Sequence, residues 1–191
     1  MAKLDKLDKI LITLIVICVG VLLGEITACI IFFRRVDMPD ASYSMDDYYA
    51  SIYTLYNEYD ASLNNQQHKN YYRNMIEDQA KFGPYLYLET HMDDNSGLAI
   101  LMLRTIVIDK DITNVETYCM VFAHEVMHFK TFHGNETYVS FETFKFLYES
   151  DDPYLHNVGV KYGLQQLYGY YGGEYDCHNY IINYLVKGDT K

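Results

Sequence analysis

The hydrophobic and polar positions divide the chain into one long apolar run near its start and a mixed remainder. From Ile10 to Phe33 the sequence is almost wholly apolar, and Glu25 is the only charged residue inside the run. These 24 residues would rise roughly 36 Å as a helix, enough to cross a hydrocarbon core of ~30 Å. Basic residues flank both ends of the run: Lys3, Lys6, Lys9, Arg34 and Arg35. The pattern predicts a single-pass transmembrane anchor over residues 1–35.

Two other interpretations of this run are less favoured. A cleaved signal peptide usually has an apolar core of only about 7–15 residues. A lipoprotein site at Cys29 is disfavoured because Glu25 lies close before it and apolar residues continue after it. The lysines before the run outnumber the arginines after it, which favours a cytoplasmic N-terminus and an extracytoplasmic soluble domain.

Beyond residue 35 the chain alternates helical stretches with short strand-like runs, separated by turn signals. The predicted helices cover residues 44–59, 62–81, 113–132, 136–149, 154–171 and 174–187. Residues 85–89 and 105–109 are predicted strands, and the stretch that begins at Leu98 fits either a strand or a helix. We therefore expect an α+β fold, mostly helical with a small sheet, forming one domain over residues 36–191.

The clearest local signal is a helix start at residues 113–116. Their sequence, Thr-Asn-Val-Glu, is a capping box in which Thr113 would be the N-cap and Glu116 would reach back to it. The helix that it opens should end near Phe132, where His133 and Gly134 provide a stop.

Composition and charge exclude some classes of function. Residues 36–191 hold ten basic and 23 acidic residues, and no basic stripe is visible, so nucleic-acid binding is not expected. A domain of this net charge would be repelled by an anionic membrane surface. Two cysteines, Cys119 and Cys177, lie outside the apolar run. They could form one disulfide in an oxidising compartment or remain two buried thiols.

Candidate metal chemistry lies within the capped helix, at His124-Glu125-Val126-Met127-His128. Histidines four residues apart lie one turn apart on the same helix face, so both imidazoles can bind one metal ion. Neutral imidazole suits Zn²⁺, and Glu125 can take a proton from a zinc-bound water without ligating the metal. Apolar residues around the motif are typical of a buried catalytic helix. The alternative is two histidines that face a partner or solvent without a metal.

This motif, with Asn135 and Glu136 opening the next helix, resembles the zincin metallopeptidases and, within them, the gluzincins. The stretch from the motif to Gly159 is also similar to a family of bacterial, membrane-anchored, metallopeptidase-like proteins. The resemblance implies a zincin-like domain, a Zn²⁺ cofactor and a glutamate on the following helix as the third ligand. Lys130 departs from the pattern, which has a hydrophobic residue there.

The third ligand has more than one candidate. Glu136 is the choice that the resemblance implies. If the two helices form a tight hairpin around Gly134, however, Glu142 would lie level with the two histidines, and Glu136 would require a steep crossing. Glu174 is a further possibility.

The sequence thus leads to a functional hypothesis and a rival. We expect a membrane-anchored zinc metallopeptidase in which His124, His128 and Glu136 hold Zn²⁺ and Glu125 activates a water against a peptide bond. By analogy with zincins, the strand at Thr105–Asp109 would be the edge that pairs with a peptide or protein substrate. The alternative is a membrane-tethered interaction or sensor module with a structural or vestigial zinc site.

Overall fold

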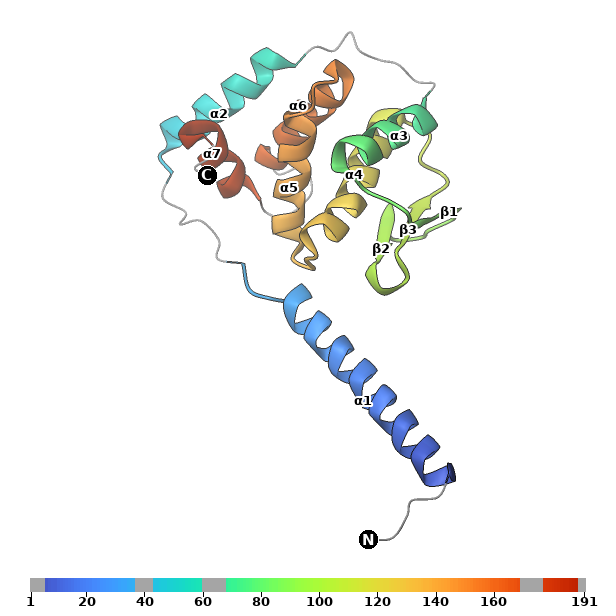
Figure 1. Cartoon of the computed structure of the whole chain (residues 1–191). Coiled ribbons are helices and arrows are strands. Elements are labelled where there is room, and N and C mark those ends of the chain that lie inside the picture. Colours follow the sequence, from blue (N-terminus) through green and yellow to red (C-terminus); the bar gives the residue numbers. More distant parts are fainter. Residues whose placement is uncertain (1–5, 37–42, 60–67, 169–176, 189–191) are drawn as a thin grey trace. The chain divides into compact units, whose positions relative to one another are not determined.

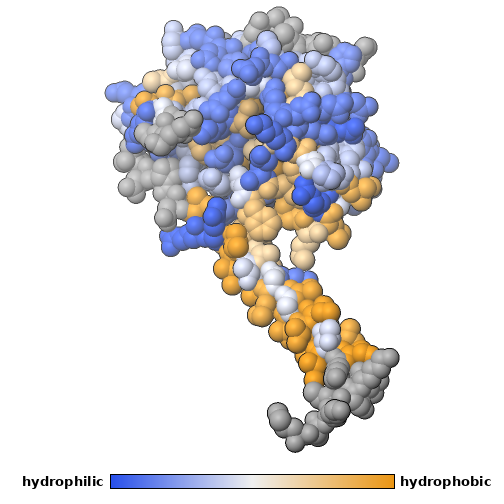
Figure 2. Space-filling model, viewed as in Figure 1, coloured by the Kyte–Doolittle hydropathy of each residue, from blue (hydrophilic) through white to orange (hydrophobic). Residues whose placement is uncertain are grey.

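The computed structural model describes residues 6–36, 43–59, 68–168 and 177–188, and it divides the chain into two compact units (Figure 1). The first unit, Met1–Arg35, contains the helix α1 (Lys6–Phe32). Its segment Ile10–Phe32 is long and apolar enough to cross a membrane, and Figure 2 shows hydrophobic residues along its length. Glu25 lies within this segment.

The second unit, Val36–Lys191, is mostly helical with a small sheet, as predicted. Its helices are α2 (Met45–Glu58), α3 (Lys69–Ala80), α4 (Val115–Thr131), α5 (Glu136–Tyr148), α6 (Pro153–Leu167) and α7 (His178–Lys187). Its strands are β1 (Leu86–Thr90), β2 (Gly97–Ile100) and β3 (Thr105–Asp109), and the 3₁₀ turn η1 (Leu101–Leu103) joins β2 to β3. Parts of the helices predicted over 62–81, 154–171 and 174–187 lie outside the described residues.

The three strands form a sheet in the order β1-β3-β2. β1 runs parallel to β3, with Leu88 opposite Val107, and β2 runs antiparallel to β3, with Leu98 opposite the same valine. Because β3 is paired on both sides, the prediction that Thr105–Asp109 forms the edge for a substrate is wrong. Within the described sheet, β1 and β2 are the outer strands. The stretch that begins at Leu98 fitted either a strand or a helix, and it contains some of each: the strand β2 is followed by the 3₁₀ turn η1.

Helix α4 is the centre of the domain and packs against α3, α5, α6 and two strands of the sheet. Several of its apolar residues are fully buried, including Phe122, Ala123 and Val126. Ile106 and Ile108 of β3 are also fully buried in the same core. Burial of this kind stabilises a fold by ~25 cal/mol per Å² of apolar surface, so the core fixes α4 rigidly relative to its neighbours.

The ends of α4 differ by one or two residues from the prediction. Asn114, not Thr113, is the N-cap, and its side-chain oxygen accepts from the backbone amides of Glu116 and Thr117. At the other end Phe132 adopts the left-handed conformation, with φ of 48°, and its N–H donates to the carbonyl of His128. The chain therefore turns before Gly134, which leaves residues 133–135 to lead directly into α5.

Candidate metal centre

The structure brings His124, His128 and Glu136 together where α4 meets the start of α5. The two histidines lie one turn apart on α4, and their rings are 4.8 Å apart between centroids. Glu136 is the first residue of α5, whose N-cap Asn135 accepts from the amide of Tyr138. Capping fixes where α5 begins and hence where the carboxylate of Glu136 is presented.

Two imidazole nitrogens and one carboxylate oxygen converge in this group. His124 Nε2 lies 2.9 Å from Glu136 Oε2, and His128 Nε2 lies 3.3 Å from the same oxygen. The three candidate ligand atoms all lie within 4.8 Å of one another. Two histidines and one glutamate are a donor set that suits Zn²⁺ and leaves a fourth coordination position open.

The other nitrogen of each ring faces an oxygen acceptor. His128 Nδ1 donates to the backbone carbonyl of His133 at 2.9 Å. His124 Nδ1 lies 3.5 Å from Thr143 Oγ1, whose own hydroxyl donates to the carbonyl of Val139. A proton on each Nδ1 leaves each Nε2 with a lone pair for a metal ion, which is the tautomer that a metal-binding histidine needs.

The charges of the group support the same interpretation. Burial alone would raise the pKa of Glu136, but hydrogen bonds from His124 and His128 outweigh it and lower that pKa to about 2. Burial alone would lower the pKa of His128, but the hydrogen bond to Glu136 and its charge outweigh this and raise it. Both nitrogens of His128 face oxygen, and neutral imidazole carries only one N–H. Either a proton or a metal ion must therefore occupy Nε2, so the residues fit a bound cation.

Glu125 lies beside this group and against strand β2. It is the one carboxylate among the described residues that is buried, and burial raises its pKa. The imidazoles of His124 and His128, and a hydrogen bond with the backbone of Ala99, act in the opposite direction. A Cβ on Gly97 would lie 2.7 Å from Glu125 Oε1, so the glycine makes room for this side chain.

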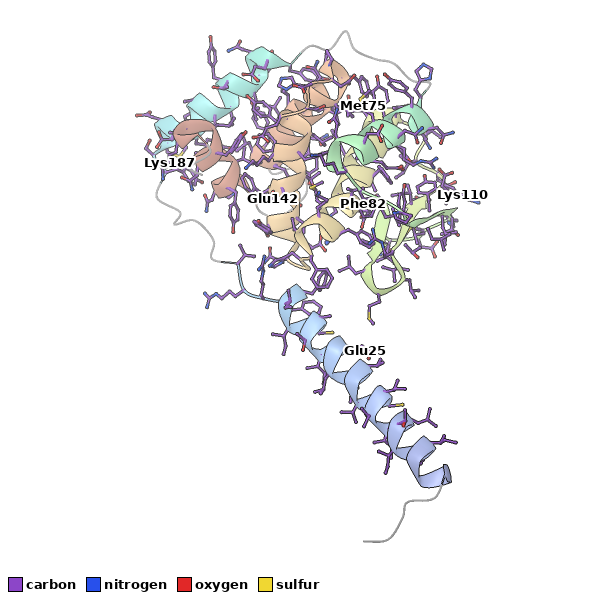
Figure 3. The ribbon with its side chains drawn as sticks, in the orientation of Figure 1. Glu25, Met75, Phe82, Lys110, Glu142 and Lys187 are labelled. Carbon is purple, nitrogen blue, oxygen red and sulfur yellow. The ribbon has the colours of Figure 1, made fainter. Side chains whose placement is uncertain are left out.

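The other predicted ligands stand apart from the group. Glu142 lies midway along α5 (Figure 3) and is not a member of it. It precedes Thr143, which contacts His124, and successive helical residues are turned by about 100° around the axis. Glu136 and Thr143 share one face of α5, and both reach the histidines from that face. Glu174 lies outside the described residues.

Sequence reasoning missed three features of this region. Thr143 and Gly97 have no motif, although Thr143 lies seven residues after Glu136, a spacing that places both on one helix face. A second group, His91, Asp109 and Asp111, also brings candidate ligand atoms within 4.8 Å of one another, at the surface of the sheet. Its members come from two separate segments, and no local spacing could have linked them.

Comparisons with known proteins add no relative to this description. No family model, no curated protein and no solved structure matches the chain. The interpretation of the site therefore rests on its residues and their geometry.

Proposed function

We propose that the chain is a membrane-anchored, zinc-dependent metallopeptidase. α1 is its transmembrane anchor, and the helices and sheet of residues 36–191 form a zincin-like domain that acts outside the cytoplasm. The observation that carries the proposal is the convergence of His124 Nε2, His128 Nε2 and Glu136 Oε2 beside the buried Glu125.

Each residue of the group has a distinct role in this proposal. His124, His128 and Glu136 hold Zn²⁺, and Zn²⁺ in such a site supplies a Lewis acid that polarises a carbonyl and lowers the pKa of water. Glu125 accepts a proton from the attacking water and passes it to the leaving amine. Its raised pKa suits that work, because a base that is too acidic holds the proton poorly.

Strand β2 is the surface on which we place an extended peptide. Glu125 hydrogen-bonds with the backbone of Ala99, so the carboxylate lies directly at this outer strand. A peptide that adds to an outer strand gains backbone hydrogen bonds without regard to its side chains. Its scissile carbonyl would then lie close to both Glu125 and the histidines.

The rival hypothesis is a tethered interaction module in which zinc is structural. Structural zinc sites are closed by four protein ligands. The group within the described residues has three, and the Glu136 side chain keeps 36% of its surface exposed. This favours a site that is open to a water and a substrate.

The proposal is tested with the full chain in detergent, wild type beside Glu125→Gln. We expect about one zinc per chain in both proteins. Wild type should cleave members of a peptide library, and the variant should lose at least about 10²-fold in rate, because the proton acceptor is gone. Loss of zinc from the variant would contradict the role of Glu125. Zinc in wild type without cleavage would favour the interaction module.

A further inference from the structure

The turn η1 presents apolar side chains to solvent at one end of the sheet. Met102 and Leu103 are each 70% exposed and are neighbours in this turn. The outer face of the sheet continues this surface with Leu86, Leu88 and Leu98, which are exposed by 55%, 45% and 46%. Figure 2 shows hydrophobic residues gathered at the edge of the domain where Figure 1 places β2 and β3.

Exposed cations lie toward the same end of the sheet. Arg104 follows η1 directly, and its guanidinium donates to the carbonyl of Pro84 and lies over the ring of Phe82. Phe82 in turn packs against Phe129, near the end of α4. Lys81 and Lys130 lie next in sequence to these two phenylalanines, and both are exposed. Arg104 thus adjoins the apolar turn, and two exposed lysines follow the aromatic contacts away from it, in a domain that is strongly acidic overall.

The opposite end of the sheet carries the reverse charge. Four aspartates lie there, around the ends of β1 and β3, with Lys110 among them: Asp93, Asp94, Asp109 and Asp111. The length of β1 separates the two ends by about 13 Å at a strand rise of ~3.3 Å per residue. Figure 3 labels Phe82 near the apolar end and Lys110 near the acidic end.

The chain keeps the domain as a whole within a short distance of a bilayer if α1 spans it. Nine residues separate Arg35 from Met45, the first residue of α2. Fully extended, they reach about 30 Å, roughly the diameter of a small domain. Tethering at this distance gives even a weak membrane-binding surface a high effective concentration at the bilayer.

We propose that η1 is a membrane-docking tip, in which Met102 and Leu103 enter the interface of an anionic bilayer and Arg104, Lys81 and Lys130 contact its headgroups. The proposal rests on the anchoring by α1 that is part of the proposed function. Interfacial binding combines buried apolar area with attraction to anionic lipids, and this end of the sheet offers both. The net charge of the domain repels it from such a surface in other orientations, so the charge distribution selects this one.

Docking in this orientation has a consequence for the substrate. β2 runs from Gly97, beside Glu125, to Ile100, where η1 begins. Three residues of strand cover about 10 Å, so the catalytic carboxylate would lie a short distance above the lipid surface. The peptides within reach are the membrane-proximal segments of other membrane proteins.

The experiment uses the full chain in nanodiscs that contain phosphatidylcholine and phosphatidylglycerol. Cys18 and Cys29 are first replaced by alanine, since the other two cysteines are buried. An environment-sensitive fluorophore is attached at Leu103→Cys or, as a matched control at the acidic end, at Asp94→Cys. Quenching is then measured with lipids that carry a doxyl group near the headgroup.

We expect the probe at position 103 to shift to the blue and lose most of its fluorescence to the doxyl lipid, and the probe at position 94 to keep its fluorescence. Adding Met102→Asp to the chain labelled at position 103 should abolish the quenching. Replacing phosphatidylglycerol by phosphatidylcholine should weaken it.

An unquenched probe at position 103, in a chain that co-elutes with the nanodiscs, would overturn the docking tip and leave the anchor intact. Equal quenching at both positions would overturn the orientation. A blue shift without quenching would mean that another protein or a second copy covers the tip. Failure to co-elute would overturn the anchor and, with it, the docking tip.

Discussion

Among the described residues, two groups of histidine and carboxylate side chains bring three candidate ligand atoms within 4.8 Å of one another, and the groups differ in how the side chains are held. One is the group of His124, His128 and Glu136, and the other is the group of His91, Asp109 and Asp111. In the first group the histidines keep only 19% and 9% of their side-chain surface exposed, and all three residues lie on helices. In the second, His91 and Asp111 are 59% and 57% exposed.

The second group shows that ligand atoms can converge without being oriented toward one metal ion. The two ring nitrogens of His91 contact different aspartates, Asp111 at 2.6 Å and Asp93 at 3.2 Å. Exposed ion pairs of this kind contribute little, because water and salt compete for them. The Nε2 atoms of the first group point at one oxygen, and their Nδ1 atoms are fixed by acceptors. Orientation and burial, rather than the kinds of ligand, therefore distinguish the candidate centre.

The largest effect on this comparison is expected at Gly97. Only the first group has a buried carboxylate beside it, that of Glu125, which lies against β2. Gly97→Ala should lower peptidase activity by about 10²-fold, because a Cβ at 2.7 Å displaces Glu125 by a fraction of an ångström or more. Zinc content should stay unchanged. The control is Leu98→Ala, which alters the exposed face of the same strand, and the measurement is the rate on a cleavable peptide. Equal rates for the two variants would contradict the positioning of Glu125 by β2.

A smaller effect is expected at Thr143, which faces His124 Nδ1. Thr143→Val keeps the shape of the side chain but removes the acceptor, so zinc affinity should fall by about 10-fold. Thr143→Ser should restore it. Competition with a chelator of known affinity measures the change. If valine and serine give the same affinity as threonine, the hydroxyl does not orient the ligand.

The smallest effect concerns the metal-free protein and its pH dependence. The lowered pKa of Glu136 stabilises the fold above pH 4.5, and this contribution is lost as the pH falls towards 2. The raised pKa of His128 stabilises it below pH 6.5, and this contribution is lost as the pH rises through the folded-state value. The Tm difference between wild type and Glu136→Gln should therefore be largest between pH 4.5 and 6.5. A Tm difference that grows steadily above pH 7 would show that the pair of Glu136 and His128 does not cause it.

The sequence predicted those parts of the structure that depend on local spacing. The helix that bears the motif, the start of α5 at Glu136 and the apolar run of α1 follow from capping residues, helical period and length. Strand order did not follow, because pairing of β3 on both sides depends on contacts between distant segments. That is why the edge strand was misplaced.

In the candidate site, too, the sequence predicted the features that depend on local spacing. His124 and His128 follow from a spacing of four, and Glu136 came from a resemblance while hairpin geometry favoured Glu142. The structure adds what no spacing contains: Glu125 lies against Gly97 and Ala99 of a strand far away in the sequence. The left-handed Phe132 also turns the chain directly after α4, which brings the start of α5 close to His128.

The metal content of the full chain in detergent tests the central claim most directly, with wild type compared with His128→Ala and His91→Ala. We expect about one zinc per chain in wild type and in His91→Ala, and none in His128→Ala, because only the oriented, half-buried group binds the ion tightly. Zinc that persists in His128→Ala but disappears in His91→Ala, or folded wild type without zinc, would contradict the account.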